Sequence, residues 1–103
     1  MKNIFITAND YTILSNILKT LPYDVIVFGS RIKGTQQKLS DLDLCLKTTN
    51  IALVDMAQLK EALSNSELPF IVDVVDYNDV SQGFKKIIDE QGANFFDTRP
   101  ALS

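Results

Sequence analysis

Apolar residues recur along the chain at helical spacing in three places, each bounded by helix start or stop signals. The first run follows Thr7, which with Asp10 three residues later resembles a capping box, and Pro22 ends it. The apolar positions of this run are Tyr11, Leu14, Ile17, Leu18 and Leu21. The other two predicted helices run from about Leu53 to Ser64, and from a start capped by Asp79 and Gln82 to Gly92.

Between the helices lie runs of β-branched, aromatic and leucine residues that predict strands. These strands are Asp24 to Gly29, Asp41 to Lys47, and Phe70 to Tyr77, the last one starting just after Pro69. Ser30 to Gly34 is expected to form a turn or a short helix, and Thr35 to Ser40 a polar loop. Side chains alternate along a strand, so Asp41, Asp43 and Cys45 should share one face.

This order of elements, about α-β-α-β-α-β-α, predicts an α/β (α+β) fold in which helices flank a small mixed β-sheet. The strand order is left open. At 103 residues the chain is expected to be one domain, 1–103, because smaller pieces would bury too little apolar surface. From Asn94 onward the sequence indicates no element, although Phe95 and Phe96 should pack against something.

Composition narrows the classes of function. No apolar run is long enough to cross a bilayer, and residues 1–6 are too short and too weakly apolar for a secretory signal. A single cysteine, Cys45, fits a reducing cytoplasm. The net charge of −3 argues against binding a nucleic-acid backbone. With no histidine, a metal site would use oxygen ligands, which favours Mg²⁺ or Mn²⁺.

Two aspartates two residues apart on one strand are the first candidate for chemistry. Their backbones lie about 7 Å apart on the same face, so Asp41 and Asp43 could converge on a pair of divalent cations. Taken alone, the pattern is more typical of a solvated strand face. Asp73 is a third candidate, because it interrupts an apolar strand where an unpaired buried carboxylate would be costly. Asp76 lies on the opposite face near the strand end, where a capping role is ordinary.

A glycine and a serine directly after the first strand form the second candidate. Gly29 permits a tight turn, and Ser30 with the following amides could hold a phosphate. Taken alone, this is also the pattern of a turn with a serine N-cap. Ten residues separate Ser30 from Asp41, within the string GSRIKGTQQKLSDLDL.

Together these motifs resemble the nucleotidyltransferase superfamily that includes DNA polymerase β. More narrowly, the chain resembles the minimal nucleotidyltransferases (MNT), the catalytic half of bacterial HEPN/MNT pairs. The resemblance covers nearly the whole chain and includes the Gly-Ser-Arg turn with Gly34, the Ser-Asp-Leu-Asp-Leu strand and the later LPFIVDVVD segment.

The resemblance implies a role for each matching residue. Gly29 and Ser30 correspond to the phosphate-holding turn, Asp41 and Asp43 to the carboxylates that bridge two Mg²⁺ ions (Mn²⁺ being possible), and Asp73 to the third acid, which places or deprotonates the nucleophile. Arg31 is expected among the nucleotide-binding residues, although Arg31 and Lys33 also have the pattern of solvated surface charges.

The implied function is AMP transfer from ATP, or from another nucleoside triphosphate, to an acceptor hydroxyl. By the same resemblance the acceptor is a tyrosine of a small helical HEPN-type toxin, and the chain is its antitoxin. Three alternatives stay open: a non-catalytic antitoxin that acts by contact, transfer to a small molecule such as an aminoglycoside-type acceptor in a homo-oligomer, and transfer to an RNA end. A P-loop ATPase is excluded because its glycine-rich motif is absent.

The remaining polar and aromatic residues favour structural roles. Cys45, on a strand interior, is expected to be a small buried apolar residue. Tyr11, Tyr23 and Tyr77 are expected to pack in the core or at its edge, the alternative being to stack on a base.

Overall fold

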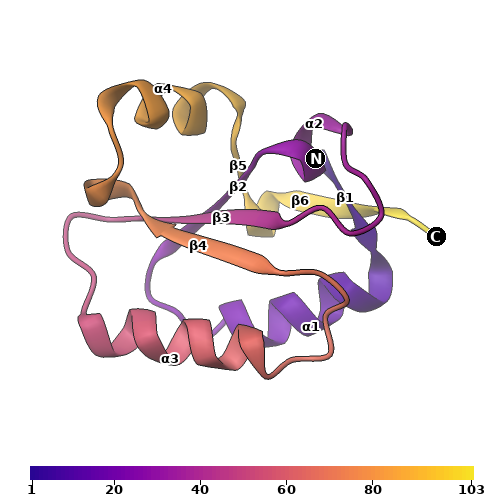
Figure 1. Cartoon of the computed structure of the whole chain (residues 1–103), viewed down its shortest axis with the longest axis horizontal. Coiled ribbons are helices and arrows are strands. Elements are labelled where there is room, and N and C mark those ends of the chain that lie inside the picture. Colours follow the sequence, from indigo (N-terminus) through magenta and orange to yellow (C-terminus); the bar gives the residue numbers. More distant parts are fainter.

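The computed structural model describes residues 1–103 and has a four-stranded mixed sheet with helices on both faces (Figure 1). The sheet order is β4-β3-β2-β5, formed by β4 (Val72–Asp76), β3 (Leu42–Lys47), β2 (Asp24–Phe28) and β5 (Ala93–Asn94). β3 and β4 are parallel, whereas β2 runs antiparallel to both β3 and β5. The predicted mixed sheet flanked by helices is therefore confirmed.

A separate two-stranded sheet joins the two ends of the chain, and the sequence did not predict it. β1 (Lys2–Thr7) pairs in parallel with β6 (Thr98–Leu102). Ile4 and Ile6 point into the core from β1 with no solvent exposure. Of the two phenylalanines expected to pack, Phe95 is fully buried in the short helix η2 (Phe95–Asp97), whereas Phe96 is 45% exposed.

The main core lies between the sheet and two helices, α1 (Ala8–Leu18) and α3 (Leu53–Ser64), which Figure 1 shows below the sheet. The Thr7 side chain caps α1 by accepting a hydrogen bond from the Asp10 amide at 3.1 Å. The buried core-facing residues of the four-stranded sheet are leucine and valine: Val25, Val27, Leu42, Leu44, Leu46 and Val74. Every second residue of each strand therefore faces this core, as the alternation predicts.

The opposite face of the sheet is only partly covered, by α4 (Gln82–Gln91), which Figure 1 shows above it. Phe28, Cys45 and Ile88 form a small second core under this helix. The predicted cap of α4 was wrong: Ser81 accepts the hydrogen bond from Phe84 N, and Asp79 belongs to the preceding turn η1 (Tyr77–Asp79). No helix is both long and apolar enough to cross a membrane.

Candidate active site

One row of residues across three adjacent strands brings the sequence motifs together. Asp43 on β3 lies opposite Phe28 on β2 and opposite Asp73 on β4. These positions share the face that carries α4, because the next row, with Cys45, packs under that helix. Neighbouring strands are about 4.8 Å apart, so Asp43 and Asp73 are side by side. The turn at Gly29 begins directly after Phe28, at the end of the same row.

Gly29 presses against the Asp43 carboxylate. Its φ is +83°, a conformation that only glycine adopts without strain. A Cβ atom built at this position would collide with Asp43 Oδ2. The chain then forms the four-residue helix α2 (Ser30–Lys33), which Gly34 closes in the left-handed conformation with its amide 2.9 Å from the Ser30 carbonyl. The absence of a side chain at Gly29 therefore allows the Asp43 carboxylate to pack directly against the backbone of the turn.

The three acids are electrostatically coupled. Burial raises the pKa of Asp43 above its ordinary value of 3.8, and repulsion from Asp73 and then Asp41 raises it further. Asp41, just before β3, and Asp73 are both exposed, whereas Asp43 is half-buried. Partial burial among like charges opposes ionisation of Asp43, so a cation bound nearby would stabilise the ionised carboxylate.

The donor set fits a hard divalent cation such as Mg²⁺, since it contains only carboxylate oxygens. The close approach of the Gly29 backbone to Asp43 Oδ2 also places the turn directly beside this carboxylate. As the side chains lie, however, no three acidic or cysteine side chains converge closely enough to hold a metal ion together. The backbone thus places the carboxylates as neighbours, and their side chains point to no common centre.

Asp73 and Asp76 differ as the strand pattern predicted, although one reason given for Asp73 was wrong. Asp73 is exposed, so the cost of burying a carboxylate does not explain it. Asp76 caps η1: its Oδ1 accepts hydrogen bonds from the backbone and side-chain nitrogens of Asn78, at 2.8 and 3.0 Å. Asp76 therefore has a structural partner, whereas Asp73 stands beside Asp43.

Arg31 is not a solvated surface charge. It is 3% exposed, and its guanidinium donates hydrogen bonds to three backbone carbonyls. These bonds also argue against the expected contact of Arg31 with a nucleotide phosphate, because they direct the guanidinium into the protein. Lys33, by contrast, is exposed as expected.

The predictions for cysteine and tyrosine are confirmed. Cys45 is fully buried, and burial raises the pKa of its thiol to about 11, so it is no nucleophile at neutral pH. All three tyrosine hydroxyls donate to protein acceptors: Tyr11 to the Phe95 and Thr98 carbonyls, Tyr23 to Asp55, and Tyr77 to Asp89. Tyr11 also stacks on Phe95, with ring centroids 4.7 Å apart.

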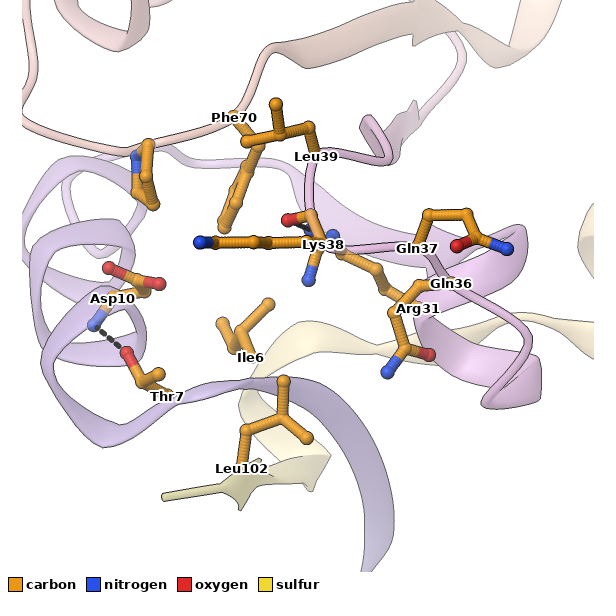
Figure 2. Close-up of a pocket in the computed structure, with 11 residues that line it drawn as sticks. Ile6, Thr7, Asp10, Arg31, Gln36, Gln37, Lys38, Leu39, Phe70 and Leu102 are labelled. Carbon is orange, nitrogen blue, oxygen red and sulfur yellow. Dashed lines mark hydrogen bonds between the residues drawn. The ribbon is translucent and has the colours of Figure 1, made fainter.

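A separate cavity of about 300 Å³ lies between the start of α1 and the loop before β3 (Figure 2). Its lining includes Asp10, Arg31, Lys38 and Phe70, and none of the three candidate acids. Asp10 is only 8% exposed. An aspartate in the first turn of an amphipathic helix is usually exposed, so the sequence did not indicate this burial.

Comparison with known proteins agrees with this geometry. The profile of the family described as Polymerase beta, Nucleotidyltransferase matches residues 12–101. Over 86 residues the chain is 40% identical to the probable protein adenylyltransferase MntA of Haemophilus influenzae, an alignment that spans 81% of this chain and 75% of that protein.

A chain in a crystal structure of a toxin-antitoxin with AMP-PNP has a similar fold, with a TM-score of 0.66 and 24% sequence identity. That match covers 84% of this chain and 72% of the other. The chain belongs to the polymerase β nucleotidyltransferase family and is a nucleotidyltransferase of the MNT type.

Proposed function

We propose that the chain transfers AMP from ATP to an acceptor hydroxyl, with Mg²⁺ bound at Asp41, Asp43 and Asp73. The observation that carries this proposal is the row in which Asp43 lies between Asp73 and the strand end that leads into Gly29. The row brings together the carboxylates that would hold cations and the turn that would hold phosphates. The family of the chain makes nucleotidyl transfer the class of reaction.

Each residue has a distinct task. Asp41, Asp43 and Asp73 would hold two Mg²⁺ or Mn²⁺ ions, which would supply charge neutralisation at the α-phosphate and the leaving pyrophosphate and would acidify the incoming hydroxyl. Ser30 hydrogen-bonds the outer phosphates, and Gly29 lets the backbone approach them. Asp73 orients the acceptor hydroxyl and receives its proton. The hydroxyl oxygen then forms a bond to the α-phosphorus as the bond to pyrophosphate breaks.

We further propose that the acceptor is a tyrosine on a partner protein, a small helical HEPN-type toxin, in the cytoplasm. Two comparisons support a protein acceptor: the name of the relative MntA, a probable protein adenylyltransferase, and the description of the structural neighbour, a toxin-antitoxin with AMP-PNP. The chain would then act as an antitoxin by modifying its partner.

Mass spectrometry tests this function. The chain, Mg²⁺ and ATP are incubated with the candidate partner, whose intact mass is expected to rise by whole adenylyl units. Peptide mapping should place the added group on tyrosine. A partner that is neutralised with no change in mass would instead identify a non-catalytic antitoxin.

The paired variants Asp73→Asn and Asp76→Asn separate the two acids of β4. Asp73→Asn is expected to lower the rate of AMP transfer by about 100-fold or more, because it removes a cation ligand and proton acceptor. Asp76→Asn should leave the rate within about threefold, with a small loss of stability from the weakened cap, about 1 kcal/mol or less. The reverse order of effects on the initial rate would contradict the assignment of Asp73.

Metal and nucleotide together are expected to stabilise the fold. Because only the native state presents the coupled acids beside the turn, Mg²⁺ with a non-hydrolysable ATP analogue should raise the melting temperature. Ligand at about 100 times its Kd would add about 2.7 kcal/mol, or roughly 10 °C or more for a chain of this size. Differential scanning fluorimetry measures the shift, and no shift at millimolar concentrations of both would count against the site.

A further inference from the structure

Arg31 occupies the junction between the segments that carry the candidate site. Its Nε donates to the Ser40 carbonyl at 3.0 Å, its Nη1 to the Phe5 carbonyl at 2.9 Å, and its Nη2 to the Lys38 carbonyl at 3.2 Å. One buried guanidinium thus links α2 to β1 and, at two points, to the loop before β3.

Two of these contacts, with the Ser40 and Lys38 carbonyls, lie close in sequence to Asp41 of the proposed active site. Arg31 itself directly follows Ser30, and Ser40 directly precedes Asp41. Two hydrogen bonds to the loop therefore fix the path of the chain from the phosphate-holding turn to the first carboxylate.

The third acid is connected through Phe70. The Arg31 guanidinium lies over the Phe70 ring, 4.3 Å from its centroid, and Phe70 comes three residues before Asp73. The next residue, Ile71, accepts a hydrogen bond from the Leu42 amide at 2.9 Å, which holds the starts of β3 and β4 together. Figure 2 shows Arg31 and Phe70 among the residues that line the cavity beside α1.

We propose that Arg31 is a positioning residue, which sets Asp41 and Asp43 in place relative to Ser30 and Asp73 and touches neither nucleotide nor metal. This proposal rests on the proposed function for its kinetic consequence. Its structural basis is independent: the guanidinium contacts carbonyls and a ring that belong to the segments bearing all three acids.

Arginine suits this role and lysine does not. A planar guanidinium presents five N–H donors in a fixed fork, so it can serve three carbonyls in different directions while its face packs on a ring. An ammonium is a point charge on a flexible stem and cannot reproduce that geometry. Burial lowers the pKa of Arg31, but the nearby Asp10 carboxylate opposes this shift, and arginine stays charged at neutral pH.

The test compares Arg31→Lys with the matched control Arg99→Lys, which changes the only other arginine, an exposed one. Steady-state kinetics with ATP are measured below the melting temperature of each variant. We expect Arg31→Lys to lower kcat by about 100-fold, since small displacements of catalytic groups have effects of this size. The KM for ATP should stay within about threefold, and Arg99→Lys should match the wild type.

Two outcomes overturn the proposal. An unchanged kcat means that the hydrogen bonds of Arg31 serve stability alone, and a KM that rises at constant kcat means that Arg31 contacts the nucleotide directly. If Arg31→Lys does not fold, Phe70→Leu replaces it: this change removes the ring under the guanidinium, keeps an apolar side chain, and should lower kcat about fivefold at constant KM. An unchanged kcat there overturns the proposal as well.

Hydrogen exchange separates this proposal from the proposed function. The amides of residues 37–42 should exchange faster in Arg31→Lys than in the wild type or Arg99→Lys, whether or not the chain transfers AMP. Equal exchange in the three proteins overturns the positioning role. Inactive wild-type protein with faster exchange in Arg31→Lys would instead contradict the proposed function and leave the loop-fixing role of Arg31 in place.

Discussion

Replacing Asp43 by asparagine is expected to lower the rate of AMP transfer about 1,000-fold, equivalent to ~4 kcal/mol of transition-state stabilisation. Asp43 is the central member of the row, beside Asp73 on one side and beside the turn at Gly29 on the other. An amide cannot supply the negative charge that holds a divalent cation there. Release of labelled AMP product from α-labelled ATP, in the presence of the acceptor, measures the loss.

Asp24→Asn is the matched control. Asp24 is an exposed aspartate on the same face of the sheet, at the opposite end of β2, where it lies across from Lys47. The same change of charge there should leave the rate within about twofold, because surface substitutions away from the site have small effects. Equal losses in both variants would show that net charge, rather than the site, controls the rate.

Asp43→Asn is also expected to stabilise the metal-free protein. The pKa of Asp43 is raised in the folded state, by burial and then by Asp73 and Asp41. The protonated Asp43 carboxyl therefore contributes to the stability of the fold at pH values below the pKa of the unfolded state. This contribution is lost as the pH rises through the pKa of the folded state. Asp43→Asn should raise the melting temperature at neutral pH without metal, and the gain should shrink towards pH 3. A gain that grows on acidification would contradict the sign of this shift.

Gly29→Ala is expected to damage both stability and activity. The new Cβ would meet Asp43 Oδ2 in a backbone conformation with φ +83° that alanine rarely adopts. Strain of this kind costs about 1–3 kcal/mol, which lowers the melting temperature by roughly 5–15 °C in a domain of this size. Because the Asp43 carboxylate must move away, the rate of AMP transfer should also fall about 100-fold.

Gly83→Ala provides the control for this prediction. Gly83 lies in α4, and a Cβ there would meet nothing within 4 Å. Alanine favours the helix over glycine by about 0.5–1 kcal/mol, so this variant should melt slightly higher and keep full activity. Thermal melts and transfer rates of the two variants decide between strain at one turn and a general intolerance of added methyl groups.

Local signals in the sequence predicted the elements that build the site. The alternation from Asp41 to Lys47 gave the correct face for Asp43, and Leu53 to Ser64 forms a helix with the predicted bounds. Such elements depend on residues close together in sequence, so their patterns can be read without the rest of the chain.

Pairings between distant segments were not predictable in the same way. β1 is a short strand whose partner, β6, lies at the other end of the chain, with Lys2 opposite Thr98. β6 contains Pro100, which weakens its strand pattern. Only the folded structure shows that β1 and β6 pair to form a sheet.

The burial of Arg31 was also not predicted from the sequence. A charged residue in a polar segment is usually solvated, and nothing local to GSRIKG indicates that three backbone carbonyls from distant and neighbouring segments surround the guanidinium. The exposure of Asp73 was missed for a similar reason, because apolar neighbours along a strand do not reveal whether the face beyond them is covered.

The most direct test of the site is a crystal structure with Mn²⁺ and a non-hydrolysable ATP analogue, in which anomalous scattering locates the cations. We expect Mn²⁺ within bonding distance of the Asp43 carboxylate and of at least one of Asp41 and Asp73, with the triphosphate against Gly29 and Ser30. Nucleotide and metal bound elsewhere, for example in the cavity beside Asp10, would contradict the site at its foundation.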